Sequence, residues 1–152
     1  MGNIGRASRL IDDVHALGVT EFCVCAGSRN APLLVVLGQR KDVRLYSFVD
    51  ERAAAFFAIG RSKAHGSPVA VVTTSGTAVA ELLPAAVEAH YSGIPLILIS
   101  ADRPARYRTT GAPQSIEQED LFGVYAETSP ETWSRRRPLH LNIEFDEPLI
   151  DE

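Results

Sequence analysis

Residues 48–60 read Phe-Val-Asp-Glu-Arg-Ala-Ala-Ala-Phe-Phe-Ala-Ile-Gly, and this stretch joins a strand signal to a helix signal. The aromatic and β-branched residues before Asp50 favour a β-strand. The seven uncharged, mostly apolar residues Ala53–Ile59 would occupy every side of a helix, and a helix that is apolar all round is buried. We therefore expect its first turn, with Glu51, to be buried too. A carboxyl group in such a site has a raised pKa and exchanges protons near neutrality, so Glu51 is the first candidate for a catalytic acid.

The same change from strand to helix repeats along the chain. The predicted strands cover residues 21–25, 43–49, 69–73, 95–100 and 138–145. The predicted helices cover residues 4–17, 31–38, 50–64 and 75–91. Asn30 and Asp50 are the expected N-caps of two of these helices. Alternating strands and helices predict an α/β domain with a mainly parallel sheet and helices on both faces.

Four of the predicted strands end in segments that carry polar residues. These segments are residues 26–29, 50–52, 74–77 and 101–104. The carboxyl ends of parallel strands lie at one edge of the sheet, where open α/β sheets bind their ligands. We therefore expect the four segments to meet at a ligand site.

Several of these residues also have an ordinary structural interpretation. Ser28 and Arg29 either belong to a tight turn or form a clamp in which Arg29 binds the carboxylate of an organic acid. Arg103 is either held by its neighbour Asp102 or free to bind a substrate. Glu51 is either a catalytic acid or a residue that complements the positive end of the helix dipole. The individual residues leave these alternatives open.

The segment Thr74-Ser75-Gly76-Thr77 follows a buried strand and opens a helix. It either holds a phosphate or caps the helix, with the glycine giving clearance for the backbone. It matches neither the Walker pattern nor the Gly-x-Gly-x-x-Gly pattern, which disfavours a nucleotide-binding domain.

Composition excludes several classes of protein. The 152 residues fit one domain with a real core, and 15 basic against 19 acidic residues give a formal net charge of −4, which argues against nucleic acid as a partner. The apolar segments are too short for a membrane span and the chain begins without an apolar signal core, so we expect a soluble, cytoplasmic protein. Cys23 and Cys25 are expected to be reduced, and the four histidines lack metal-ligand spacing, so no metal site is predicted.

Five motifs, taken together in their order and spacing, resemble one family. They are residues 26–33 (Ala-Gly-Ser-Arg-Asn-Ala-Pro-Leu), 48–52 (Phe-Val-Asp-Glu-Arg), 74–78 (Thr-Ser-Gly-Thr-Ala), 101–104 (Ala-Asp-Arg-Pro) and 111–114 (Gly-Ala-Pro-Gln). The family is that of the menaquinone-pathway enzyme 2-succinyl-5-enolpyruvyl-6-hydroxy-3-cyclohexene-1-carboxylate synthase. The likeness covers residues 4–122 and resumes at 138–143, and five motifs in register are more specific than any one of them.

The resemblance implies a transferase, a carboligase that uses thiamine diphosphate and a divalent metal, Mg²⁺ or Mn²⁺. Members of the family join the succinyl unit of decarboxylated 2-oxoglutarate to isochorismate. Glu51 matches the family's catalytic glutamate, whose carboxyl group hydrogen-bonds a ring nitrogen of the aminopyrimidine and so helps to generate the carbanion nucleophile. A buried carboxyl group that can be protonated suits this task.

The resemblance also implies roles for five other residues. Ser28, Arg29 and Arg103 would hold the carboxylates of isochorismate. Thr77 would approach the pyrimidine, and Gln114 would lie beside both the cofactor and the substrate. The phosphate interpretation of the glycine turn is then disfavoured, because the family's diphosphate and metal sit on a different domain.

Residues 1–152 are thus expected to be a single amino-terminal pyrimidine-binding domain, with a shortened connection near 128–137 and with the middle and diphosphate-binding domains absent. Such a chain would be inactive alone and would need a diphosphate-binding domain in cis or in trans, as a fragment or as one subunit of a split enzyme. We also expect a homodimer or another homo-oligomer, because the segment after Glu51 resembles one that lies at a subunit interface in thiamine-diphosphate enzymes. A non-catalytic interaction domain is the alternative.

Overall fold

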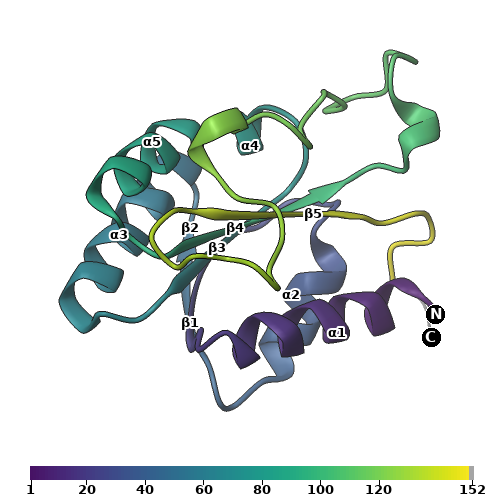
Figure 1. Ribbon diagram of the computed structural model, residues 1–152. Helices are drawn as coiled ribbons and strands as arrows, with labels where there is room; N and C mark the ends of the chain where they lie inside the picture. Colours follow the sequence, from purple (N-terminus) through teal and green to yellow (C-terminus); the bar gives the residue numbers. More distant parts are fainter. Residues whose placement is uncertain (151–152) are drawn as a thin grey trace.

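Five parallel strands form one sheet in the order β2-β1-β3-β4-β5, and helices cover both of its faces (Figure 1). The computed structural model describes residues 1–150. The strands are β1 (Glu21–Cys25), β2 (Arg44–Phe48), β3 (Val69–Thr73), β4 (Leu96–Asp102) and β5 (Leu139–Glu144). The helices are α1 (Asn3–Ala16), α2 (Ala31–Gln39), α3 (Glu51–His65), α4 (Thr77–Ala80) and α5 (Leu83–Ser92), with the 3₁₀ turns η1 (Ala105–Tyr107) and η2 (Gly123–Tyr125). The predicted α/β fold with a parallel sheet is confirmed.

The middle of the sheet is buried on both faces. Every residue of β3 and β4 is buried, as is typical where helices cover a parallel sheet on both sides. One core cluster joins the sheet to α1 and α2, with Ile11, Leu33 and Leu37 fully buried. The other cluster joins the sheet to α3 and α5, with Ala55 and Ala86 fully buried. The small side chains of α3 and α5 allow these helices to pack closely on the sheet.

Helix α3 buries only one of its faces. Ala54 and Ala58 are fully buried, whereas Phe56 and Phe57 keep 43% and 38% of their surface exposed. The expectation that the whole helix is buried, and Glu51 with it, is therefore wrong, and Glu51 is half-buried. The reason is that α3 belongs to the outer layer on its side of the sheet, so its far face meets solvent (Figure 1).

The two predicted N-caps have different outcomes. Asp50 caps α3 as predicted, because its Oδ1 accepts the Ala53 N–H at 2.8 Å. Asn30 stands at the N-cap of α2, as predicted, but its side chain makes no cap bond to the helix. Its side chain instead accepts the Gly27 N–H and donates to the Cys25 carbonyl, both at 2.9 Å. Asn30 therefore closes the turn after β1.

The helix predicted over residues 75–91 is two helices, α4 and α5, separated at Glu81 and Leu82. The physical reason is Pro84. Its nitrogen has no hydrogen to donate, and its ring would clash with the Ala80 carbonyl in a continuous helix. Pro84 instead occupies the first turn of α5, where no N–H is needed.

Strand β5 pairs with β4 from Leu139 opposite Ile97 to Glu144 opposite Asp102, which confirms the strand predicted over 138–145. Before β5, residues 128–137 form neither helix nor strand. Trp133 packs into the core on the α1 side, and its Nε1–H donates to the Arg137 carbonyl at 2.7 Å. One aromatic side chain therefore anchors this connection to the core.

The chain leaves the sheet toward opposite faces after β1 and after β3. β1 leads into α2 on one face, and β3 leads into α4 and α5 on the other. Such a topological switch point is where open α/β sheets form their ligand crevice. Gly27, after β1, lies here against Thr74, after β3, and a Cβ on Gly27 would stand 2.6 Å from the Thr74 Cβ. The close approach of these two strand ends therefore excludes a side chain at residue 27.

Gly27→Ala should destabilise the fold by about 1–3 kcal/mol, because the added methyl group overlaps Thr74. Gly38→Ala is the matched control, since nothing lies within 4 Å of its added Cβ and residue 38 is in α2. This control should be neutral or should stabilise the helix by up to about 1 kcal/mol. Urea unfolding measures both changes. Equal stability of Gly27→Ala and the wild type would contradict the close packing of the two strand ends.

Candidate functional site

Ser28 and Arg29 follow β1, and the structure places them differently. Ser28 is exposed, whereas Arg29 keeps only 5% of its surface exposed. Arg29 Nη1 donates to the Phe145 carbonyl at 2.9 Å, and Nη2 donates to Glu147 Oε1 at 3.2 Å. The buried Arg29 Nε has no hydrogen-bond partner within residues 1–150. The guanidinium group thus faces the segment after β5, where Glu147 already provides a carboxylate.

Glu51 begins α3, three residues after Phe48, the end of β2. Its charge acts on Cys25, the last residue of β1. Burial first, and then the nearby carboxylates of Glu51 and Asp50, raise the pKa of the Cys25 thiol to about 12. Glu51 therefore lies near the end of β1, at the same edge of the sheet as the turn that carries Ser28.

The turn after β3 is held by residues much further along the chain. Gly76 has a φ of 81°, which favours glycine, and its N–H donates to Gln118 Oε1 at 3.0 Å. A Cβ on Gly76 would lie 2.9 Å from Gln114 Cα, so the backbone of Gln114 packs on this turn. Thr77 follows directly and is exposed at the start of α4. The structure thus brings the segments of Thr77 and Gln114 together, and Gly76 provides the backbone clearance that the sequence suggested.

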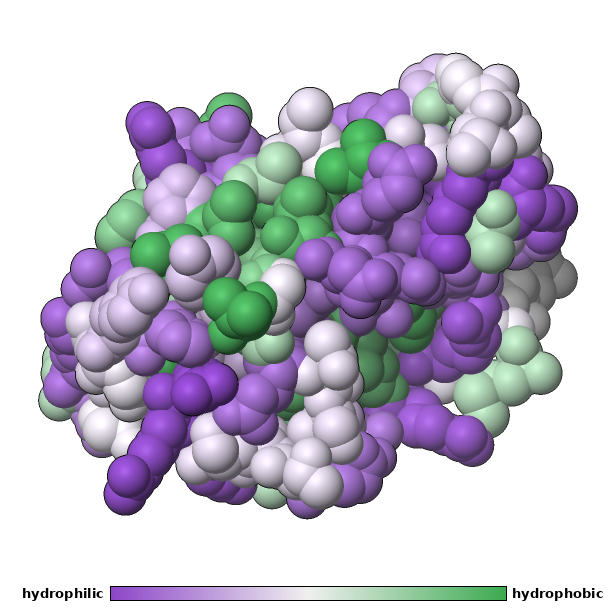
Figure 2. Space-filling model, turned by 45° about the horizontal axis from the view of Figure 1, so that its top comes forward, coloured by the Kyte–Doolittle hydropathy of each residue, from purple (hydrophilic) through white to green (hydrophobic). Residues whose placement is uncertain are grey.

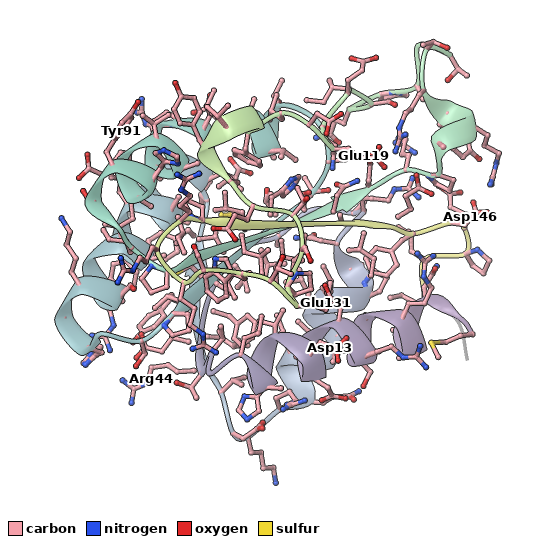
Figure 3. All side chains as sticks on the ribbon, viewed as in Figure 1. Asp13, Arg44, Tyr91, Glu119, Glu131 and Asp146 are labelled. Atoms are coloured by element: carbon pink, nitrogen blue, oxygen red, sulfur yellow. The ribbon has the colours of Figure 1, made fainter. Side chains whose placement is uncertain are left out.

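The loop after β4 carries three arginines, and two of them are used in ion pairs. Arg106 Nη2 lies 2.5 Å from Asp146 Oδ1. Arg108 Nη2 lies 2.8 Å from Glu119 Oε1 and 3.0 Å from Glu144 Oε1. Figure 3 labels Glu119, from the loop above the sheet, and Asp146, from the segment after β5. These pairs hold the loop to the rest of the domain.

The third arginine, Arg103, is held differently. Asp102 Oδ1 accepts the backbone N–H of Arg103 at 2.7 Å, and Arg103 Nε donates to the Pro113 carbonyl at 2.9 Å. The carboxylate of Asp102 pairs instead with Arg108, 3.5 Å away. Asp102 therefore does not tether the Arg103 guanidinium, whose Nε is held by the loop backbone instead.

A buried polar network underlies these loops, and sequence reasoning missed it. Gln118, with 1% of its surface exposed, donates to the Ala101 carbonyl at 3.1 Å and to Asn142 Oδ1 at 2.8 Å. Asn142 Nδ2 donates to Asp102 Oδ2 at 3.0 Å, and Ser100 Oγ donates to Asn142 Oδ1 at 2.7 Å. The ends of β4 and β5 and the Gln118 loop are therefore joined by buried and partly buried hydrogen bonds.

One signal in the sequence points to this network. Ser100 and Asp102 lie two apart, and so do His140 and Asn142. Residues two apart in a strand share one face, so neighbouring strands with this pattern place a polar row between them. The signal for Gln118 is weaker, since it is one polar residue in a polar loop.

The predicted site residues stand on the carboxyl edge of the sheet, apart from a hollow of about 400 Å³. That hollow lies along β5 and is lined by Leu10, Thr128, His140 and Asn142, among others, but by none of the predicted site residues. Within residues 1–150, no group of three or more His, Cys, Asp or Glu side chains is arranged to hold a metal ion. The same residues contain no helix that is long and apolar enough to cross a membrane.

The fold is a parallel α/β sheet with polar residues along its carboxyl edge, where such sheets bind ligands. Residues 6–121 match the family described as thiamine pyrophosphate enzyme, N-terminal TPP binding domain, and the chain belongs to this family. Thiamine pyrophosphate is another name for thiamine diphosphate. The cofactor class that the sequence suggested is thereby confirmed.

Similar relatives carry the name 2-succinyl-5-enolpyruvyl-6-hydroxy-3-cyclohexene-1-carboxylate synthase. The chain is 49% identical to the synthase of Bdellovibrio bacteriovorus, over 99% of the chain and 31% of the relative. It is 52% identical to the synthase of Akkermansia muciniphila, over 86% of the chain and 27% of the relative. It is 42% identical to the synthase of Halobacterium salinarum, over 94% of the chain and 29% of the relative. The resemblance to this family is confirmed, and the chain spans less than a third of the length of these relatives.

His140, whose Nε2 lies 2.7 Å from Ser100 Oγ of the polar network, should make the stability of the domain depend on pH. Burial lowers the pKa of His140 from 6.5 to about 4. As the pH falls below 6.5, His140 of the unfolded chain binds a proton before His140 of the folded chain does. The free energy of unfolding therefore decreases between pH 6.5 and 4, by on the order of 3 kcal/mol. Urea unfolding across this range should show a shallower loss in His140→Gln. His65→Gln, at an exposed histidine, should keep the wild-type slope, and a wild-type slope in His140→Gln would contradict the buried neutral imidazole.

Proposed function

We propose that this chain is the pyrimidine-binding domain of a cytoplasmic enzyme that joins decarboxylated 2-oxoglutarate to isochorismate in menaquinone biosynthesis. Its family and the shared name of its relatives support this proposal. The observation that carries it is the position of Glu51. This acid begins α3 near the end of β1, at the same edge of the sheet as the contact between the Thr77 turn and Gln114.

The carboxyl edge suits the pyrimidine end of thiamine diphosphate. When bound, the cofactor supplies the carbanion nucleophile of the reaction. Glu51 would hydrogen-bond a ring nitrogen of the aminopyrimidine and exchange a proton with it. Thr77 and Gln114, whose segments touch through Gly76, would flank the ring. Because Glu51 is half-buried in this chain, the cofactor or a partner would complete its burial.

The two arginines proposed to bind the substrate, Arg103 and Arg29, differ in the partners that they now have. Arg103 has its guanidinium free of Asp102, so a carboxylate of isochorismate would form its ion pair. Arg29 would have to exchange Glu147 for the substrate, since that carboxylate now lies 3.2 Å from its Nη2. Ser28, exposed at the same turn, would donate its hydroxyl group to the substrate.

Another domain, in cis or in trans, would hold the diphosphate and its Mg²⁺ or Mn²⁺. An anion at the turn after β3 would need the Gly76 N–H, which is already donated to Gln118. Helix α4, which follows this turn, has only 4 residues and offers little dipole. The chain would therefore supply the pyrimidine half of an active site that a diphosphate-binding domain completes.

A reconstitution experiment tests the role of Glu51. The chain, mixed with the diphosphate-binding domain of a relative, thiamine diphosphate, Mg²⁺, 2-oxoglutarate and isochorismate, should release carbon dioxide. Glu51→Gln should lower the rate by at least about 100-fold, because an amide cannot exchange the proton. Glu81→Gln, at an exposed carboxylate, should keep the wild-type rate. Continued turnover by Glu51→Gln would sink the catalytic assignment.

A second candidate function, a non-catalytic interaction domain, is motivated by exposed apolar surface. Figure 2 shows hydrophobic side chains gathered on the part of the surface around α4 and α5. The exposed large hydrophobic residues include Phe56 and Phe57 of α3, Tyr91 of α5 and Val124 of η2. Exposed apolar surface is typical of an interface, and a second copy of the chain would cover it in a homodimer.

Light scattering tests the homodimer. Phe56→Ser should shift the chain from dimer toward monomer, because it removes an apolar side chain from the proposed interface. Val35→Ser is the control, since Val35 is an exposed apolar residue of α2, in the opposite helical layer. A wild-type chain that stays monomeric at every concentration would exclude the homodimer. A tight dimer that shows no response to thiamine diphosphate, even with the partner domain present, would favour the interaction function.

A further inference from the structure

We propose that Gln118 is the positioning residue of the carboxyl edge. Its buried side chain sets where Thr77, Gln114 and Arg103 stand, and it touches neither cofactor nor substrate. The roles of those three residues rest on the proposed function, whereas the contacts of Gln118 stand independently of it.

The Gln118 amide fits its surroundings in only one orientation. The Gly76 N–H can only donate, so Oε1 must face it, at 3.0 Å. The Ala101 carbonyl can only accept, so Nε2 must face it, at 3.1 Å, and the second N–H donates to Asn142 Oδ1 at 2.8 Å. Turning the amide over would leave buried groups unpaired, which is costly for a side chain that is 1% exposed. Gln118 therefore locks the turn after β3 to the ends of β4 and β5.

On the β3 side, Gln118 holds the residue that precedes Thr77. Gly76 has φ 81° and ψ −139°, a conformation that glycine adopts with least strain. The same glycine packs on Gln114, whose own φ of 55° is uncommon for a residue with a side chain. Gln114 also lies four residues before Gln118 in the chain. A change in the Gln118 contacts would therefore move both Thr77 and Gln114.

On the β4 side, Gln118 reaches Arg103 by two routes. One route is the Ala101 carbonyl, two residues before Arg103, which accepts the first N–H of the amide. The other passes through Asn142, whose Nδ2 donates to Asp102 Oδ2 at 3.0 Å. The second oxygen of Asp102 accepts the Arg103 backbone N–H at 2.7 Å. Both routes depend on the donor groups of the Gln118 amide.

Two substitutions of Gln118 remove different sets of these hydrogen bonds. Gln118→Glu keeps the shape of the side chain and an acceptor for Gly76, but it loses the donors to Ala101 and Asn142. Gln118→Met keeps a similar length and loses every hydrogen bond. Glu117→Gln, at the exposed neighbouring residue, is the matched control. Circular dichroism first checks that each variant folds. If Gln118→Met does not fold, Gln118→Glu alone is used for the test.

NMR of the 152-residue chain gives a readout that needs no activity. The backbone amide signals of Thr77, Gln114 and Arg103 should shift in Gln118→Met, and that of Arg103 should shift in Gln118→Glu, while the control keeps the wild-type spectrum at all three. Hydrogen exchange at the Gly76 amide should accelerate by about tenfold in Gln118→Met, because its acceptor is lost. Wild-type shifts at these amides in a folded Gln118 variant would overturn the positioning role.

The reconstituted enzyme gives a second readout. Gln118→Glu should raise the KM for isochorismate about tenfold, because it loses the bonds on the Arg103 side and keeps the acceptor for Gly76. It should leave the KM for thiamine diphosphate, the KM for 2-oxoglutarate and kcat at saturation within about twofold. A lower kcat with every KM unchanged would indicate only less folded enzyme and would overturn the proposal. If the wild-type mixture releases no carbon dioxide, the proposed function fails, and the amide shifts still decide the role of Gln118.

Discussion

The two central strands, β3 and β4, are buried on both faces, and this burial constrains every connection in the molecule. Parallel strands need crossover connections, and both faces can be covered only if those connections pass on the two sides of the sheet. The segments after β1, β2, β3 and β4 consequently emerge at one edge. An acid, two arginines and two segments in close contact share that edge because the backbone path brings them there, although their sequence neighbours have little in common.

Much of this path could be predicted from the sequence. β1 and β3 agree residue for residue with the predicted ranges 21–25 and 69–73, because short apolar runs bounded by polar or turn residues define a strand closely. The exposure of α3 could not be predicted in this way. Ala55 and Phe56 are both apolar and adjacent, yet only Ala55 meets the sheet, since composition does not say which face of a helix is covered. The break between α4 and α5 could have been predicted from the sequence, because Pro84 does not allow a continuous helix from Ala80 onward.

The candidate site also has features that the sequence predicts and features that it does not. Its location follows from topology, but the state of each side chain depends on partners far along the chain. Arg29 bonds to Phe145, 116 residues away, and Gly76 bonds to Gln118, 42 residues away. Local sequence carries no signal for such pairs, so the burial of Arg29 and its contact with Phe145 could not be predicted. The same limit hid the Gln118 network, whose members look like ordinary loop and strand polar residues.

The contacts of residues 145–148 join parts of the domain that lie far apart in the sequence. Asn3 Nδ2, in the first helix, donates to the carbonyls of Asp146 and Pro148 at 2.6 and 2.9 Å, and Arg29 donates to the carbonyl of Phe145. Asn3 and Arg29 therefore lack these acceptors until residues 145–148 have been synthesised. Pairing across such long sequence separations is intrinsically slow. The turn after β1, at the carboxyl edge, is therefore completed by residues that lie more than a hundred positions further along the sequence.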